Sequence, residues 1–414
     1  MNMMKTLTYY LASFLFLLHL VSCGEGEEPI PLDSMPVILE FSPQEGSAGT
    51  EVVIKGARFS NNISENIVEF NGTQAEIVEA DSFEITAIVP DGATSGKVAV
   101  KVQEQKALSL DDFTVVLSPW RRVADFGGEI RVEGIAFSIG SKGYLGTGVG
   151  TESAHQTDFW EYDPATDQWK KLSAFAGYGI QSGVGFSVGN LGYVGLGTVG
   201  GSSTSAFYAY DPASDNWTRK ADFAGDSRSH AVSFTIGEKA YVGTGASWHS
   251  RYNDFWEYNP ATDSWKRLAD FPGGERADAV AFSIGNKGYI GMGNGSGTRH
   301  KDLYEYDPAT DTWTQKADLP AAVISYSTTL ENRSSAVSFS IGQKGYVCTG
   351  NASGYTMKDL WEYDPVTDTW TRLEDFGGNS RSDAHGFVIG DKGYLGCGDG
   401  SLRFGDFWEL SLQE

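Results

Sequence analysis

The sequence predicts an all-β protein made of a small sandwich followed by a ring of six four-stranded sheets. Three observations support this fold class: a unit of about 48 residues recurs along the C-terminal part of the chain, short alternating runs punctuated by Gly, Pro and Asp fill each unit, and no stretch has the periodicity of a helix. With 414 residues, of which 40% are hydrophobic, we expect more than one domain.

The repeated unit is marked by a stretch first seen at 158–169, Asp-Phe-Trp-Glu-Tyr-Asp-Pro-Ala-Thr-Asp-Gln-Trp. It returns in edited form at 206–217, 254–265, 302–313 and 359–370, and a sixth copy begins at Asp406. A tyrosine lies upstream of each copy, at positions 144, 193, 241, 289, 346 and 394, so the period is constant except for an insertion of 9 residues within 319–332. Such a period predicts a β-propeller, because one unit cannot bury its faces alone.

Each unit has the pattern of four strands. In the third unit these are 231–236, 240–245, 254–258 and 265–268, separated by turn-forming residues. The six units need six tryptophans on their fourth strands, but the repeats supply only five. The sixth is Trp120, because residues 120–126 match 265–271. We therefore expect a six-bladed propeller closed by an N-terminal outer strand, which removes open sheet edges.

The tyrosine, the Tyr-Asp-Pro-x-Thr-Asp turn and the tryptophan together resemble the kelch repeat, over residues 118–414. The resemblance implies a kelch-type propeller with a pocket at the mouth of its central channel. The usual Gly-Gly doublet of that family is here Gly-x-Gly, as at Gly146 and Gly148, and Cys348 replaces the first glycine in the fifth unit. This departure weakens the transfer of function from other members of the family.

Residues 1–22 have the features of a targeting segment, with Lys5 as a charged flank and an apolar run that is short for a membrane span. Leu20-Val-Ser-Cys23 resembles the bacterial lipoprotein signal, which implies lipidation at Cys23; an ordinary secretory signal is the alternative. Residues 23–34, acidic and then Pro-rich, are expected to be a tether. We expect attachment to the outer membrane of the cell envelope through the lipid alone, either in the periplasm or at the cell surface.

Residues 35–117 alternate with period two between turn signals, which predicts a small Ig-like sandwich. The motifs Ser-Pro-x-x-Gly, Gly-Thr-x-Val-x-Ile-x-Gly, Phe-Asn-Gly and Val-Pro-x-Gly resemble the IPT/TIG domain, which implies a spacer or interaction module. The formal net charge of the chain is −23, which argues against a nucleic-acid partner and favours solubility outside the cytoplasm.

Loop variation predicts where a ligand binds. The turns between strands one and two and between strands three and four are short and repeat closely, whereas the loops between strands two and three and the blade connections vary and share the other face. We call this the variable face; variable loops on a rigid scaffold often carry binding sites. Aromatic planes beside Arg, His and Asp suit sugars. The ligand-binding candidates are Glu133, His155, His230, Trp248, His249, Arg251, Tyr252, Asp278, Arg299, His300, Tyr355, Asp383 and Arg403.

Two sets of residues repeat in the blade connections. Five arginines stand thirteen residues before a tyrosine, at positions 131, 228, 276, 333 and 381, while Ile180 replaces the arginine in blade two. Blade two also has Ala206 where the other third strands begin with Asp. This joint loss predicts that each arginine pairs with that aspartate. Two residues after each arginine position lies an irregular set, which is the better candidate for function: Glu133, Ser182, His230, Asp278, Ser335 and Asp383.

These features favour a binding module for a glycan or a protein over an enzyme. A sialic-acid type epimerase or mutarotase, with Glu133, His230, Asp278 or Asp383 as acid or base, is the alternative, and a structural scaffold is the third. A copper oxidase needs a cysteine on the variable face, and the sequence places none there. We expect no cofactor and no metal, because the histidines lack ligand spacing. Cys348 and Cys397 are expected to be buried free thiols.

Overall fold

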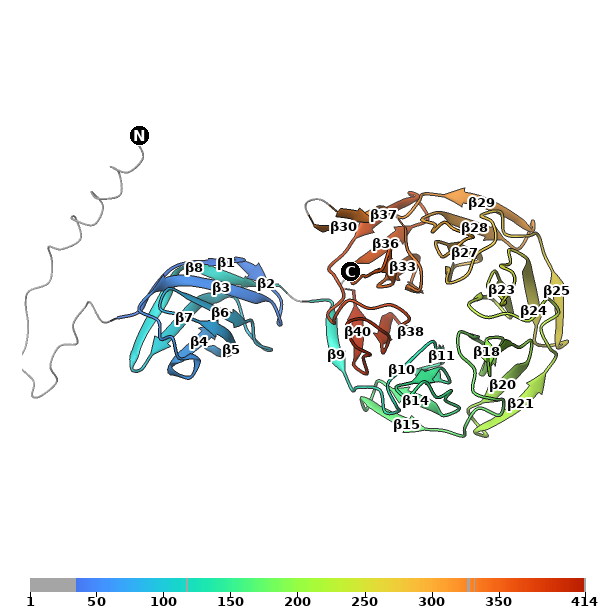
Figure 1. The fold of residues 1–414 in the computed structure, drawn as a ribbon, viewed down its shortest axis with the longest axis horizontal. Coiled ribbons are helices and arrows are strands. Elements are labelled where there is room, and N and C mark those ends of the chain that lie inside the picture. Colours follow the sequence, from blue (N-terminus) through green and yellow to red (C-terminus); the bar gives the residue numbers. More distant parts are fainter. Residues whose placement is uncertain (1–34, 117, 326–327, 331, 413–414) are drawn as a thin grey trace, which may run out of the picture. The chain divides into compact units, whose positions relative to one another are not determined.

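The computed structural model describes residues 35–412 apart from 117, 326–327 and 331, and it leaves out the side chains of 322–330. The predicted signal at 1–22, lipidation at Cys23 and tether at 23–34 lie outside the described residues. No helix in the described part of the chain is long and apolar enough to cross a membrane. The chain divides into two compact units, the first ending at residue 117 and the second beginning at Ser118 (Figure 1).

The first unit is an Ig-like sandwich whose strands form one continuous hydrogen-bonded order, β1-β3-β6-β5-β4-β7-β8-β2. Strand β5 changes sheets along its length: its residue Ala75 pairs with Val68 of β4, whereas Glu76 pairs with Ile88 of β6. The strands are β1 Val37–Ser42, β2 Glu45–Gly46, β3 Glu51–Ala57, β4 Asn66–Phe70, β5 Thr73–Ala80, β6 Glu84–Ile88, β7 Gly96–Val102 and β8 Gln105–Val115, with a 3-10 turn at Ile63–Glu65.

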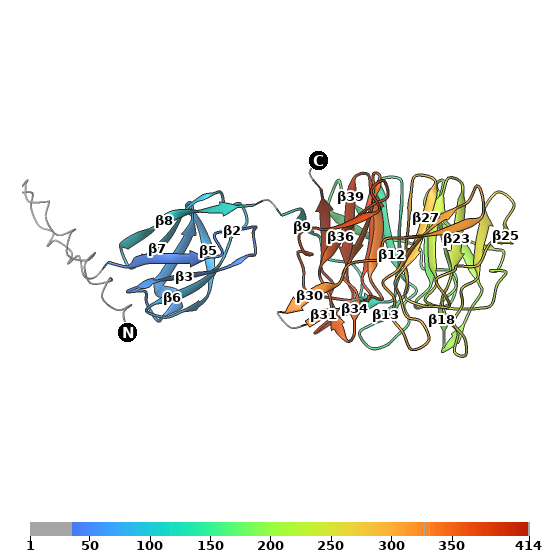
Figure 2. The ribbon, with the colours of Figure 1, turned by 90° about the horizontal axis from the view of Figure 1, so that it is seen from above.

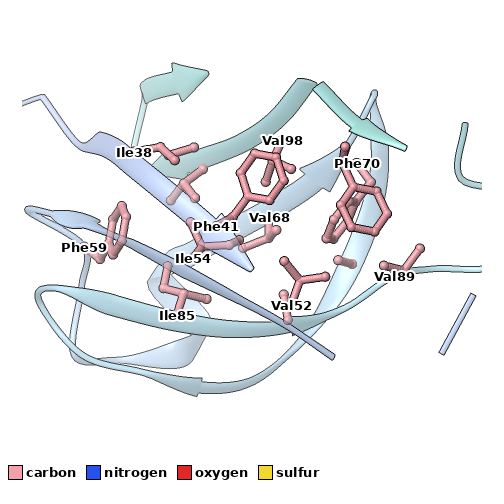
Figure 3. Close-up of a cluster of buried hydrophobic side chains, with 14 residues drawn as sticks. Ile38, Phe41, Val52, Ile54, Phe59, Val68, Phe70, Ile85, Val89 and Val98 are labelled. Atoms are coloured by element: carbon pink, nitrogen blue, oxygen red, sulfur yellow. The ribbon is translucent and has the colours of Figure 1, made fainter. Parts of the chain in front are cut away.

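The core of this unit lies between its two sheets (Figure 3). The alternation in β3 buries Val52 and Ile54 while Glu51 and Lys55 face solvent, as period-two patterning requires. Phe113 of β8 packs edge-on against Phe70 of β4, with ring centroids 4.9 Å apart. This confirms the predicted Ig-like fold.

The second unit is a six-bladed propeller of four-stranded antiparallel sheets, as predicted (Figure 1). The inner strands are β11 Ile135–Ile139, β16 Val184–Val188, β22 Val232–Ile236, β26 Val280–Ile284, β32 Val337–Ile341 and β38 His385–Ile389. The second strands are β12 Lys142–Gly146, β17 Leu191–Gly195, β23 Lys239–Gly243, β27 Lys287–Gly291, β33 Lys344–Cys348 and β39 Lys392–Gly396. The third strands are β14 Phe159–Asp163, β20 Phe207–Asp211, β24 Phe255–Asn259, β28 Leu303–Asp307, β36 Leu360–Asp364 and β40 Phe407–Ser411. The outer strands are β15 Gln168–Lys171, β21 Asn216–Lys220, β25 Ser264–Arg267, β29 Thr312–Lys316, β37 Thr369–Arg372 and β9 Trp120–Val123.

The last blade confirms the predicted closure. Strand β9 is its outer strand and pairs with β40 in antiparallel register, with Trp120 opposite Leu410 and Val123 opposite Phe407. This pairing joins the two ends of the propeller, so each blade has a neighbour on both sides and β40 has no open edge.

The repeated turn and tryptophan join neighbouring blades. In blade three, the Tyr258 hydroxyl donates to Asp263 Oδ1 at 2.6 Å, and the same carboxylate accepts the backbone N–H of Ala221 from the preceding connection at 3.0 Å. The indole of Trp265 donates to the Ala221 carbonyl at 3.3 Å. The motif therefore recurs because each copy holds the chain that leaves the previous blade.

Short two-stranded sheets decorate the variable face and are seen on one side of the propeller in Figure 2. Three are hairpins: β18 Thr198–Val199 with β19 Ser202–Ser203, β30 Ala322–Ser325 with β31 Thr328–Leu330, and β34 Asn351–Ala352 with β35 Tyr355–Thr356. A further two-stranded sheet pairs β10 Arg131–Val132 of a blade connection with β13 Val149–Gly150 of the loop between strands two and three. The hairpin β30–β31 is formed by the insertion at 319–332. Single bridges such as Ser229–Ala246 and Ala277–Asn294 join a blade connection to the loop between strands two and three, so both lie on the same face.

Candidate functional site

Six residues form a ring around the channel mouth, one from each blade connection. All six have a positive φ between 51° and 55°: Glu133, Ser182, His230, Asp278, Ser335 and Asp383. Their backbones are linked from blade to blade, because the N–H of Ser182 donates to the Glu133 carbonyl at 2.9 Å and the N–H of His230 donates to the Ser182 carbonyl at 2.7 Å. The same link joins the next three steps around the ring. We call these six residues the mouth ring. These hydrogen bonds between neighbouring blades stabilise the unusual backbone conformation of the mouth-ring residues.

The mouth ring carries three carboxylates. Glu133 accepts a hydrogen bond from the Ser182 hydroxyl at 2.8 Å, and Asp278 accepts one from the Asn294 amide at 3.0 Å. Asp383 accepts one from the Ser382 hydroxyl at 2.8 Å. Burial raises the pKa of the Asp383 carboxyl, and repulsion from Asp278 and Glu133 adds to this effect. The imidazole Nε2 of His230 lies 3.7 Å from Asp278 Oδ1.

The arginines of the blade connections are structural, as predicted. Arg131 is fully buried, and its guanidinium forms a two-pronged ion pair with Asp158 at 2.7 and 2.9 Å. It also donates to the Thr147 carbonyl at 2.9 Å and stacks 4.8 Å from the centroid of Phe126. Burial alone would raise the pKa of Asp158, but hydrogen bonds from Arg131 and Trp160 outweigh it and hold the pKa below its usual value.

The other blades repeat this pairing. The pairs are Arg228 with Asp254, Arg276 with Asp302, Arg333 with Asp359 and Arg381 with Asp406. Because these guanidinium groups are buried and paired, they are not free to bind a ligand at the mouth.

A pocket of about 550 Å³ lies on the variable face beside the loop of blade three, and four predicted residues line it: Trp248, His249, Arg251 and Tyr252. Trp248 is 88% exposed, so its indole is available to a ligand. Tyr252 is held in place, because its ring lies 4.0 Å from the guanidinium of Arg228 and its hydroxyl donates to Ser247 Oγ at 3.1 Å. Glu275 and Ser296 complete the wall, from the neighbouring blade. Four of the predicted ligand-binding residues therefore lie together in one pocket.

The other predicted residues are more scattered. Arg299 donates to the Asn294 side chain at 3.1 Å. The Nδ1 atom of His300 lies 4.0 Å from Asp302 Oδ2, and burial and Arg276 lower the pKa of its imidazole. Arg403 donates to the backbone carbonyl of Gly150 and so joins blade six to blade one. His155 and Tyr355 are exposed on their own loops, Tyr355 at 56%.

Sequence reasoning left His385 out of the candidate set. It begins β38, is only 5% exposed, and lines the central cavity of about 200 Å³ beneath the mouth ring. Burial, with a further contribution from Arg131, lowers the pKa of its imidazole to about 3, so the ring is neutral at physiological pH. The signal was present in the repeat, because every other blade has an aliphatic residue at this position: Ile135, Val184, Val232, Val280 and Val337.

Comparison with known proteins supports both units. Residues 36–115 match the family model described as IPT/TIG domain, so the first unit is an IPT/TIG domain. Comparison with curated proteins found no match. The chain is similar to a solved structure titled "Structure of YjhT", with a TM-score of 0.60 and 14% identity over 70% of this chain and 97% of that one. At that identity the likeness shows the fold alone.

Proposed function

We propose that this protein is a binding module of the cell envelope and that the variable face of its propeller binds a glycan at the pocket beside Trp248. The exposure of Trp248 at the rim of a polar pocket carries the proposal. A free indole face can stack on the apolar face of a sugar ring, while nearby polar groups bind its hydroxyls. Arg251 lines the pocket, and the guanidinium of an arginine can donate hydrogen bonds to sugar hydroxyls.

The combination of an IPT/TIG domain and a propeller fits a binding or scaffold module. A protein ligand at the same pocket is the competing outcome. An epimerase or mutarotase at the mouth ring gains no support from the geometry, since an arginine beside the acids would be needed and the five connection arginines are engaged in ion pairs.

We further propose that a lipid at Cys23 anchors the protein to the outer membrane. Replacing Cys23 with Ser in cells should release the protein from the membrane fraction.

A glycan array tests the binding proposal. We expect the wild-type protein to bind a restricted set of glycans, Trp248→Ala to lose at least about tenfold in affinity, and Trp248→Phe to retain most of it, because the aromatic plane remains. The matched control is Val366→Ala, which removes an 89% exposed apolar side chain from the turn between β36 and β37. An array without binding, or equal losses in the Val366 and Trp248 variants, would contradict the proposal.

A further inference from the structure

The loop that carries Trp248 is a short hairpin with Arg251 at its base. The loop joins β23 to β24, and Ala246 faces Arg251 across an antiparallel bridge. The backbone N–H of Ser247 donates to the carbonyl of Ser250 at 2.8 Å, so the chain turns between them and places Trp248 in the turn. The exposed indole and the guanidinium therefore belong to one hairpin and line one pocket.

Blade four has the same hairpin, but its arginine has a partner. Asn294 and Arg299 form the equivalent bridge, and Nε of Arg299 donates to the Asn294 side chain at 3.1 Å. In blade three Ala246 stands in place of the asparagine, and Nε of Arg251 is buried without a hydrogen-bond partner in the described structure. Arg251 lacks the acceptor of its counterpart, because alanine has no side-chain oxygen.

The other arginines of the propeller are all bound to oxygen atoms. Residues 118–414 contain thirteen arginines, and twelve of them donate from the side chain to an acceptor within the described structure. Arg299 and Arg403 donate to amide carbonyls. The other ten donate to carboxylates: Arg121, Arg122, Arg131, Arg219, Arg228, Arg267, Arg276, Arg333, Arg372 and Arg381. The guanidinium of Arg251 forms no hydrogen bond or ion pair with a described residue, so its charge is left for a ligand.

Two further titratable groups line the pocket. Glu275 is exposed and forms no ion pair with Arg251, although both face the same space. His249 contributes an exposed imidazole. An anion in the pocket is attracted by Arg251 and repelled by Glu275, so removing the one charge or the other should change its affinity in opposite directions.

We propose that the pocket binds an acidic sugar, with Trp248 stacked on the ring and the carboxylate of a uronic acid bound by the guanidinium of Arg251. A guanidinium donates two parallel hydrogen bonds to a carboxylate, and such charge-assisted bonds are stronger than bonds to neutral hydroxyls. An indole stacks on the apolar face of a sugar ring whether or not the sugar carries a charge. This inference rests on the proposed function, because it names the class of sugar for the same pocket.

Matched glycans isolate the carboxylate. Chemical reduction of a uronic acid replaces its carboxylate with a hydroxymethyl group, so the two forms share the sugar ring and differ in charge. On an array of uronic acid oligosaccharides and their carboxyl-reduced forms, we expect the full chain to bind an acidic form at least about tenfold more tightly than its reduced form. Equal or tighter binding of the reduced forms, or binding of sulfated sugars in place of uronic acids, would overturn the inference while glycan binding stands. An array without any binding would contradict both proposals.

Single variants separate the charge from the stacking. Arg251→Met keeps the length of the side chain without its charge and should weaken binding of the acidic form at least about tenfold, with the reduced form unaffected. Glu275→Gln should strengthen binding of the acidic form by about two- to fivefold, as expected for an exposed charge. Trp248→Ala should weaken both forms. The matched control is Arg372→Met, which removes a guanidinium paired with Asp375 on the outer strand of blade five and should change neither affinity.

Ala246→Asp supplies Arg251 with a partner from within the chain. Asn294 shows that a side chain of this length reaches the arginine across the bridge, so an aspartate should neutralise the guanidinium and weaken binding of the acidic form at least about tenfold. Ala246→Asn adds a neutral acceptor instead and should retain the preference for the acidic form. An unchanged preference in Arg251→Met or in Ala246→Asp, with unchanged thermal unfolding, would contradict the assignment.

Discussion

Blade two has apolar side chains at the two positions where blade four buries an arginine–aspartate ion pair. Blade four buries Arg276 against Asp302, and the guanidinium also lies 4.8 Å from the ring of Phe271. Blade two has Ile180 and Ala206 at these positions, and Ile180 is 3% exposed in a cluster with Phe175. Both blades keep the same strand order. The comparison indicates that the ion pair is not needed for the fold, provided that both of its halves are absent together.

The largest expected effect comes from breaking the pair in blade four. Arg276→Ile leaves Asp302 largely buried without its cation and should lower the free energy of unfolding by about 3–5 kcal/mol. Blade four is the best place for this test, because it has Tyr304 where other blades have a tryptophan. In those blades the indole donates a hydrogen bond to the aspartate of the ion pair, as Trp256 does in blade three. No indole is therefore left unpaired. Denaturant unfolding measures the change.

The double variant sharpens the result. Arg276→Ile with Asp302→Ala reproduces blade two and should recover most of the lost stability, giving a large coupling energy in the double-mutant cycle. Losses that simply add would show that the pair is needed in blade four and that blade two is stabilised in some other way.

The converse change in blade two should be somewhat smaller. Ile180→Arg places a cation in an apolar site, but the long side chain can direct its charge toward solvent at the variable face, so we expect a loss of about 2–3 kcal/mol. Adding Ala206→Asp supplies the missing carboxylate and should reverse part of the loss. Thermal unfolding of both variants provides the measurement, and a second substitution that worsens the first would contradict the comparison.

Acid should destabilise the five blades that contain an Arg–Asp ion pair more than it destabilises blade two. The pKa of Asp158, Asp254 and Asp406 is held below the usual value, because hydrogen bonds from arginine and tryptophan outweigh the opposing effect of burial. A carboxyl with a lowered folded-state pKa contributes stability that is present above its unfolded pKa of about 3.9 and is lost as the pH falls through the folded-state pKa. We expect the free energy of unfolding to fall steeply below about pH 4.

A variant of blade six provides the control for acid sensitivity. Arg381→Ile with Asp406→Ala and Trp408→Tyr copies the residues of blade two. It should lose less stability than the wild type between pH 5 and pH 3 because one low-pKa carboxyl is gone. An unchanged pH profile would mean that other carboxylates dominate acid unfolding.

The smallest effect is expected for Cys397→Thr, because threonine occupies this position in three other blades, as at Thr244. Cys348 and Cys397 are buried and unpaired, as predicted. Burial raises the pKa of the Cys397 thiol to about 12 and also raises that of Cys348, so neither should react with a thiol reagent in the native state. The Thr variant should lose about 1 kcal/mol of stability, because the equivalent hydroxyl of Thr244 is buried without a hydrogen-bond partner in the described structure. Rapid labelling of the native protein would contradict this picture.

The propeller could be predicted because the same pattern of strands and turns recurs in each blade. The joint loss at Ile180 and Ala206 predicted the ion pairs, and Trp120 predicted the closing strand; both are confirmed. The IPT/TIG domain was found from its turn motifs. These features follow from local pattern and from counting.

The candidate site was only partly predictable. Exposed loop residues could be selected by composition, but the way Trp248 and Tyr252 share a pocket with Glu275 depends on how neighbouring blades meet. His385 was missed because it lies at a buried inner-strand position, where only the break in the aliphatic pattern of the other five blades marks it. The space for its imidazole depends on Gly134, 251 positions earlier in the chain, which it meets only because the ring closes.

The closing strand also determines how the propeller responds to tension. Because β9 and β40 are antiparallel, the N–H of Ser411 donates to the Pro119 carbonyl at 2.8 Å, and both chain ends leave from the same end of the strand pair. A force that separates these ends peels the ladder one hydrogen bond at a time instead of shearing all of them together. The Trp120 indole has no hydrogen-bond partner in the described structure, unlike Trp265. A pull on the two ends should therefore open blade six first and leave the other five blades stacked.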